Sequence, residues 1–288
     1  MTPIYLLGLL FVLIGALLVW LHRGLLMSLA VRLLASTRPN AVKRHGLRID
    51  FGKHAGPWIR LTLQANLGKT LSQVLGHPVE AAAYSRFAGF NLNRRYSDFL
   101  NPQSPYYQCW LGAYAVFDSE SRTAFGFDEL GTPVERDILA ALEADQRLVY
   151  RSTGCPHRFP DGNAVRLRGE LAIEQMPAAG DGLTWWRASG LADTWSAYHK
   201  GASPAGSRLR SLVYGTVPLT AHHPVSDYHP LTYEGEFWLR YFPEYRATCA
   251  KFCIWPSSTL ARGQQALSKE QVVQQSRELL QGITFARQ

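Results

Sequence analysis

Three histidines and an aspartate gather in one short segment of the chain, TAHHPVSDYHPLT, which covers residues 220–232. They are His222, His223, Asp227 and His229. Neutral imidazole and carboxylate groups are good zinc ligands and good general acids or bases. The spacing lacks the two histidines of a helical zinc motif, and two prolines argue against a helix. Metal binding and acid–base chemistry stay open, but the pattern favours a polar loop before a strand, and we predict no bound metal.

The strand expected directly after this loop places two carboxylates on one face. In YEGEFWLRYF, residues 233–242, alternation puts four side chains on one side: Glu234, Glu236, Trp238 and Arg240. Same-face carboxylates lie about 7 Å apart, a separation compatible with paired acid and base roles. We expect this face to be a solvated outer surface, unless it lines the interior of a barrel. If the protein is an enzyme, the candidates for catalysis are His223, His229, Glu234 and Glu236, with His222 beside them.

Aromatic side chains are frequent in the second half of the chain. Most of them are expected to fill the core of a large sheet. A cupped sheet or barrel lined by such side chains also binds an apolar or planar ligand. The residues predicted to bind this ligand are Trp185, Trp195, Trp238 and Tyr241.

The four cysteines do not follow the spacing of a metal or redox motif. On a strand, Cys249 and Cys253 share a face at about 13 Å, beyond the reach of a disulfide. We therefore expect small buried thiols in a reducing compartment. The chain also lacks a nucleophile elbow and a phosphate-binding glycine loop, and we predict no cofactor.

The most apolar part of the chain is its N-terminal segment. Residues 3–21, PIYLLGLLFVLIGALLVWL, carry no charge. As a helix rising about 1.5 Å per residue, this segment approaches the ~30 Å thickness of a bilayer's hydrocarbon core. A cleaved signal peptide is the alternative, but it requires a basic start and a small-residue cleavage site that the sequence lacks. We predict a transmembrane anchor over residues 1–21 of a single-pass membrane protein.

Positive charge is concentrated just after this segment. Eight of the 30 Lys and Arg residues lie within residues 1–60, against one of the 22 acidic residues, so the rest of the chain is nearly neutral. The positive-inside rule then places the main domain in the cytoplasm. A nucleic-acid surface requires a basic patch on the folded body, so we predict no nucleic-acid partner.

A second apolar stretch, LLMSLAVRLLAS over residues 25–36, is too short to span a membrane. Its wide apolar arc predicts a helix that lies either in the membrane interface, with basic neighbours near anionic lipid, or against the protein's own core. The polar and basic segment that follows, STRPNAVKRHG over residues 36–46, is typical of a linker. Together they make up the region 22–46.

The sequence pattern of residues 47–288 predicts one α+β domain. The strands expected are LRIDF, PWIRLTLQ, YYQCWLGAYAVF, AVRLRGELAIE, LTWWRAS, DTWSAY, LRSLVYGTV, and a hairpin of LTYEGEFWLRYF and YRATCAKFCIW. The helices expected are NLGKTLSQVLG, PVEAAAYSRFAGF, TPVERDILAALEADQRL and KEQVVQQSRELLQ. This order predicts a large antiparallel β-sheet or partly closed β-barrel with a few flanking helices.

Two functional hypotheses follow from the sequence. The first is a single-pass, membrane-anchored binding protein for an apolar or lipid-like ligand or a protein partner, without catalysis. The alternative is a membrane-tethered enzyme that uses the histidine segment together with Glu234 and Glu236.

Overall fold

A computed structural model describes residues 3–21, 23–53, 58–62, 67–89, 106, 109–120, 122–153, 158–177, 184–195, 202–203, 217–218, 230–257 and 269–288. Its helices are α1 Pro3–Leu21, α2 Arg23–Ser36, α3 Leu67–Leu75, α4 Glu135–Thr153, the short 3-10 helix η3 Pro243–Tyr245 and α7 Lys269–Gln281. Its strands are β1 Ala41–Arg44, β2 Leu47–Asp50, β3 Trp58–Thr62, β4 Glu80–Gly89, β5 Trp110–Phe117, β6 Val165–Gln175, β7 Trp186–Trp195, β8 Ala202–Ser203, β9 Val217–Pro218, β10 Pro230–Phe242, β11 Ala247–Pro256 and β12 Thr284–Arg287.

A seven-stranded antiparallel sheet forms the centre of the molecule, in the order β3-β4-β5-β11-β10-β7-β6. The ladders on either side of β10 are long, and they fix which side chains share a face. β3 and β6 are its two edges, so the described strands form an open sheet and no closed barrel. The α+β class and the antiparallel sheet predicted from the sequence are confirmed, and the barrel alternative is not.

Two smaller sheets accompany the large one. The strands β1, β2 and β12 form an antiparallel sheet in that order, which brings the C-terminal strand beside the residues that follow α2. The strands β8 and β9 form a short parallel pair.

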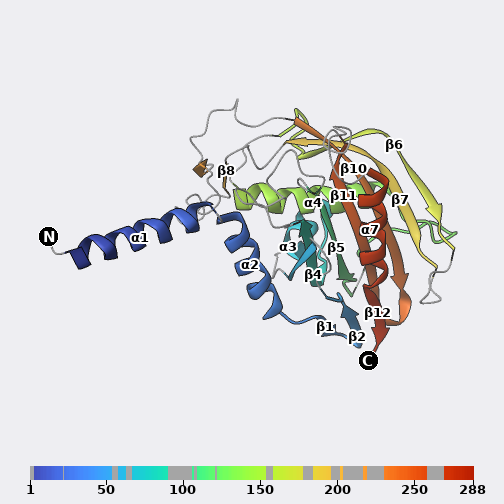
Figure 1. Cartoon of the computed structure of the whole chain (residues 1–288). Helices are drawn as coiled ribbons and strands as arrows, with labels where there is room; N and C mark the ends of the chain where they lie inside the picture. The colour runs from blue at the N-terminus through green and yellow to red at the C-terminus, as the bar shows by residue number, and fades with distance from the viewer. Residues whose placement is uncertain are drawn as a thin grey trace.

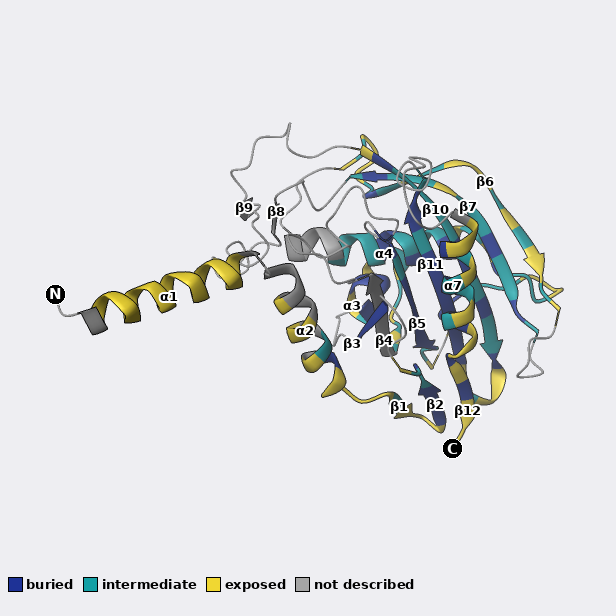
Figure 2. Ribbon diagram, viewed as in Figure 1, coloured by how far each residue is buried: buried dark blue, intermediate teal, exposed yellow. Residues whose placement is uncertain are grey.

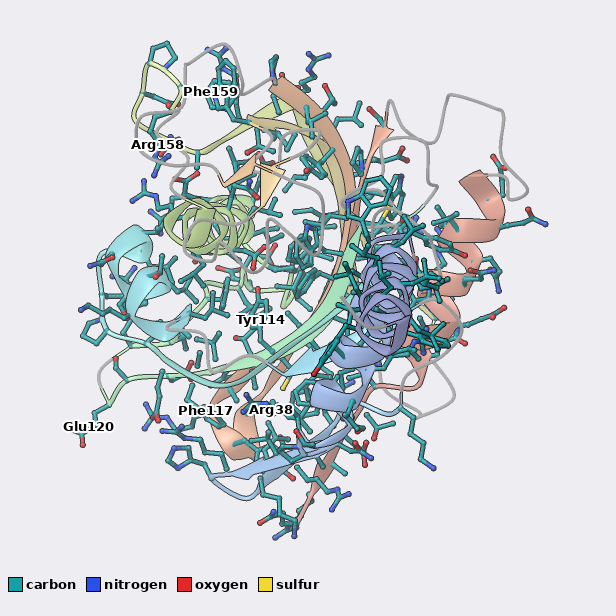
Figure 3. All side chains as sticks on the ribbon, turned by 60° about the vertical axis from the view of Figure 1, so that its left-hand side comes forward. Arg38, Tyr114, Phe117, Glu120, Arg158 and Phe159 are labelled. Carbon is teal, nitrogen blue, oxygen red and sulfur yellow. The ribbon has the colours of Figure 1, made fainter. Side chains whose placement is uncertain are left out.

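The large sheet is covered on both faces, as Figure 3 shows with α3 and α4 on one side and α7 on the other. The face toward α3 and α4 packs apolar side chains from both helices, for example Leu71 and Ile138, against Phe237 and Phe252 of the sheet. Tyr114 is buried within this layer, whereas Glu120 lies at the periphery (Figure 3). The opposite face packs against α7 and the small sheet of β1, β2 and β12. Each face therefore requires its own set of inward side chains on every strand.

The first helix lies outside this layered body, whereas the second contacts the edge strand β3 and buries Ala35. α1 projects away from the rest of the molecule, and α2 leaves its end at an angle and leads back to β1 (Figure 1). Along α1 every described side chain, from Tyr5 to Trp20, is exposed (Figure 2). Of the residues described, no helix is both long enough and apolar enough to cross a membrane. In α2, Leu26, Leu29 and Leu33 are exposed.

Several elements lie where the sequence predicts them. α3 and α7 match their expected segments, and the hairpin of β10 and β11 turns through η3 at Pro243. α4 begins at Glu135, slightly later than the expected Thr132, with Glu135 and Asp137 in its first turn. β6 alternates as expected, with Leu167, Leu171 and Ile173 half-buried, but a register shift interrupts it at Gly169, whose φ is +78°. Such a bulge needs a residue that tolerates positive φ.

Three expectations about secondary structure are wrong. The segment PVEAAAYSRFAGF forms the strand β4 and not a helix, because pairing with both β3 and β5 outweighs the helical propensity of its alanines. The expected linker 36–46 contains β1, which pairs with β2. One continuous strand, β7, runs from Trp186 to Trp195 through the segments LTWWRAS and DTWSAY, where the sequence predicts two strands. The expected strand LRSLVYGTV lies mostly outside the described residues.

Candidate functional site

A cavity of about 770 Å³ lies between α7 and the face of the sheet formed by β7, β10 and β11. The end of β6 and the start of β12 complete its wall. Its lining residues are Met176, Pro177, Trp185, Arg187, Trp238, Lys251, Arg277, Leu280, Gln281 and Thr284. The opposite face of the sheet is filled in comparison, since the hollow beside α4 there holds only about 40 Å³. The space available for a ligand therefore lies on the α7 side.

Strand register brings the central lining residues together. Trp238 on β10 lies opposite Arg187 on β7 and opposite Lys251 on β11. Residues that are directly opposite in antiparallel strands point to the same face, with Cβ atoms about 5 Å apart. The three side chains form one row across the floor of the cavity, with a tryptophan between two cations.

Trp185 and Phe285 form an aromatic wall beside this row. Trp185 is buried, and its ring lies 5.5 Å from that of Phe285 between centroids. The ammonium of Lys251 lies 5.1 Å from the Trp185 ring centroid and 5.9 Å from that of Phe285. Attraction to the two rings stabilises a cation here, although Lys251 is only 8% exposed.

Glu236 attaches α7 to the sheet. Its carboxylate accepts hydrogen bonds from Nη2 of Arg277 at 2.7 Å and from Nε of Arg277 at 3.3 Å. Nη1 of Arg187 lies 3.7 Å away, and Arg187 also pairs with Glu174. Donation of these hydrogen bonds to Glu236 raises the pKa of the Arg277 guanidinium. A two-pronged contact of this kind fixes the orientation of α7 above the cavity.

The expectation of a solvated outer face on β10 is wrong. The grouping of side chains by face is correct, but Glu236 is only 8% exposed and Trp238 lines the cavity. Arg240 is half-buried and donates a hydrogen bond to the carbonyl of Thr184 at 3.0 Å. The helix α7, which follows β10 by almost thirty residues, covers this face.

The acid–base hypothesis has limited support from the described residues. Glu236 accepts two hydrogen bonds from Arg277, which is the arrangement of a structural ion pair and not of a free base. His222, His223 and His229 lie outside the described residues. Within the part of the chain that is described, no three His, Cys, Asp or Glu side chains gather as metal ligands would.

Two of the four predicted ligand-binding aromatics line the cavity and two do not. Trp185 and Trp238 line it, whereas Trp195 packs near Phe159 at 6.3 Å between ring centroids. Tyr241 points to the opposite face and donates a hydrogen bond to Asp118 at 2.7 Å. Partial burial and this carboxylate raise the pKa of Tyr241 to about 12.

Sequence reasoning missed the three cations of the cavity: Arg187, Lys251 and Arg277. One of them had a usable signal. In ATCAKFCIW, alternation places Lys251 on the same face as Cys249 and Cys253, so a lysine interrupts an otherwise apolar face. A lone charge among buried positions needs a partner or a function. The other two cations come from β7 and α7, and alternation in one segment does not reveal that they meet.

The described cysteines are buried thiols, as the sequence predicts. They are Cys109, Cys249 and Cys253, and none of the three forms a disulfide within the described part of the chain. Burial raises the pKa of all three thiols, so they are protonated and unreactive at neutral pH. Cys155 lies outside the described residues.

No family model, curated protein sequence or solved structure matches this chain.

Proposed function

We propose that this protein is a membrane-anchored, non-catalytic binding protein that holds an apolar or lipid-like ligand in the cavity under α7. The observation that carries this proposal is the cavity itself, lined by Trp185, Trp238 and Leu280. Its volume of about 770 Å³ falls within the range of roughly 300–1,000 Å³ that small-molecule sites occupy. Each methylene group buried there contributes about 0.8 kcal/mol, so a long apolar ligand gains most.

The exposed surface of α1 supports the membrane part of the proposal. The described side chains from Tyr5 to Trp20 are exposed, and the uncharged sequence extends over Pro3, Ile4 and Leu21. A contiguous apolar surface of this kind is costly in water and marks a contact with lipid or protein. The basic residues that follow it support a cytoplasmic location for the body, and the exposed leucines of α2 suit a contact with the membrane interface.

The membrane part is tested by flotation of the full chain with phosphatidylcholine vesicles. A Leu10→Arg, Leu13→Arg double variant of α1 should lose flotation, because each arginine costs about 2.5–3.5 kcal/mol at the centre of a span. The matched control is Leu130→Arg, because Leu130 lies on the body and is 85% exposed. This control variant should float as the wild type does. Flotation of the α1 variant at the wild-type level would refute the anchor.

The ligand part is tested by quenching of tryptophan fluorescence in nanodiscs. Two probes are used, ω-bromoundecanol and ω-bromoundecanoate, whose bromine quenches a tryptophan on contact. Trp20→Phe serves as the parent chain, because it removes the tryptophan of α1. At least one probe should quench saturably, and a further Trp185→Phe, Trp238→Phe replacement should remove most of that quenching. Saturable quenching by neither probe would refute ligand binding and leave the protein-partner hypothesis.

A further inference from the structure

We infer that the ligand of this cavity is an amphiphilic anion, with a carboxylate or phosphate group beside Lys251 and an apolar body against Trp185 and Trp238. This inference rests on the proposed function and specifies the chemical class of the ligand. It is argued from the charge, the hydrogen-bond donors and the shape of the lining.

Charge in the described part of the lining has one sign. Among the described residues, the side chains of Arg187, Lys251 and Arg277 are cationic, and no lining side chain is acidic. The carboxylate of Glu236 lies next to the cavity, where its ion pairs are with Arg277 and Arg187. Glu174 also pairs with Arg187, but the Glu174 side chain is half exposed and therefore well screened by water. An anionic group entering the cavity meets more positive than negative charge.

The position of Lys251 makes its charge effective. Lys251 is 8% exposed, and its ammonium lies over the rings of both Trp185 and Phe285. The rings keep a cation at the cavity wall without supplying a negative charge of their own. Attraction between opposite charges is stronger at such a site than at the surface, because less water screens it.

Two buried donors on lining residues point to the same class of ligand. The Nε1 of Trp185 and the Nε of Arg187 are both buried, and neither has a hydrogen-bond acceptor among the described residues. A buried donor without an acceptor is unfavourable by itself. The oxygens of a carboxylate or phosphate are strong acceptors, so such a group would satisfy donors of this kind.

The apolar remainder of the lining fits a hydrocarbon or planar body. Met176, Pro177 and Leu280 lie in the wall together with the two tryptophans. Polar side chains other than the cations are Gln281 and Thr284, both near the end of α7. Cations and apolar surface in the same cavity are what an amphiphile requires, whereas inorganic phosphate would use only the cations.

The test compares head groups on one chain length. The Trp20→Phe protein in nanodiscs is titrated with ω-bromoundecanoate, ω-bromoundecanol and an ω-bromoundecyl trimethylammonium salt, at a pH where the carboxyl group is ionised. The carboxylate should bind about ten- to a hundredfold more tightly than the alcohol, because hydrogen bonds to charged groups are the stronger ones. The ammonium probe should bind more weakly than the alcohol.

Two variants identify the cation that is responsible. Lys251→Met keeps the length of the side chain and should reduce the preference for the carboxylate over the alcohol to less than about threefold, whereas Lys251→Arg should retain it. Lys69→Met on the exposed surface of α3, behind the sheet, is the matched control and should bind as the parent does. If Lys251→Met does not fold, the head-group comparison on the parent chain decides by itself.

The outcomes separate the inference from the proposed function. Equal binding of carboxylate and alcohol would overturn the inference and leave a cavity for neutral apolar ligands. Binding of neither would overturn both. Inorganic phosphate, added as a competitor, should displace the carboxylate probe only weakly. Displacement by phosphate at an affinity equal to that of the probe would show a site for a free anion and would overturn the amphiphilic part of the inference.

Discussion

Replacement of Arg277 by methionine should loosen α7 from the sheet. Glu236 is 8% exposed and receives two hydrogen bonds from Arg277, at 2.7 and 3.3 Å. Removal of one partner from a fully buried ion pair costs about 3–5 kcal/mol. Here Arg277 is 40% exposed at its side chain, and Arg187 stays within 3.7 Å of the carboxylate. We therefore expect Arg277→Met to lower the free energy of unfolding by about 1–3 kcal/mol.

The assay is urea unfolding of the full chain in mild detergent, followed by near-ultraviolet circular dichroism. Glu236→Gln and the double variant complete a thermodynamic cycle, and the two sites should show a coupling energy of about 1–2 kcal/mol. Arg136→Met is the control, since the Arg136 side chain is 76% exposed and pairs with its neighbour Asp137. Its effect should stay within about 0.5 kcal/mol. Equal losses for Arg277→Met and Arg136→Met, or no coupling to Glu236, would refute the role given to this pair.

Three further predictions concern the fold. Gly68→Ala should destabilise the protein by about 1–3 kcal/mol, because a Cβ at Gly68 would lie 2.8 Å from the backbone nitrogen of Ala81. In urea unfolding, the control Lys69→Ala should show little change. An unchanged stability of Gly68→Ala would contradict the close packing of α3 on β4. A hydrogen bond from the backbone N–H of Gly52 lowers the pKa of Asp50 in the folded protein. The stability that this carboxylate contributes is therefore present above the unfolded-state pKa near 3.8 and is lost as the pH falls through the lower folded-state pKa. Melting temperatures of the wild type and Asp50→Asn should therefore differ above about pH 5 and converge in acid, and a difference that persists at the lowest pH would contradict this assignment. A Cys155→Ser chain should react with a thiol reagent only after unfolding, since its three other cysteines are buried with raised pKa values; rapid labelling of the native chain would contradict their burial.

The sequence predicts local features well where periodicity is strong. The two faces of β10 follow directly from alternation, and the segment of α7 is marked by its own helical pattern. The buried thiols follow from strand geometry. In each case the signal lies within one segment, so no knowledge of the tertiary structure is needed.

Features that depend on contacts between distant segments could not be predicted in this way. Alternation on β10 cannot show that α7 covers the face of Glu236, because that depends on where a later helix packs. The strand β4 has a helix-like composition, and pairing with β3 and β5 decides its structure. The cavity needs β7, β10, β11 and α7 together, so Arg187 and Arg277 gave no local signal.

The most direct test of the central claim is to locate a bound amphiphile by photolabelling. The full chain in nanodiscs is irradiated with undecanoate that carries a diazirine at its far end, and the labelled peptides are identified by mass spectrometry. We predict labels on peptides that contain Trp185, Trp238 or Leu280, suppressed by an excess of unlabelled undecanoate. Labels restricted to α1 and α2, with no suppression by competitor, would contradict a ligand-binding cavity under α7.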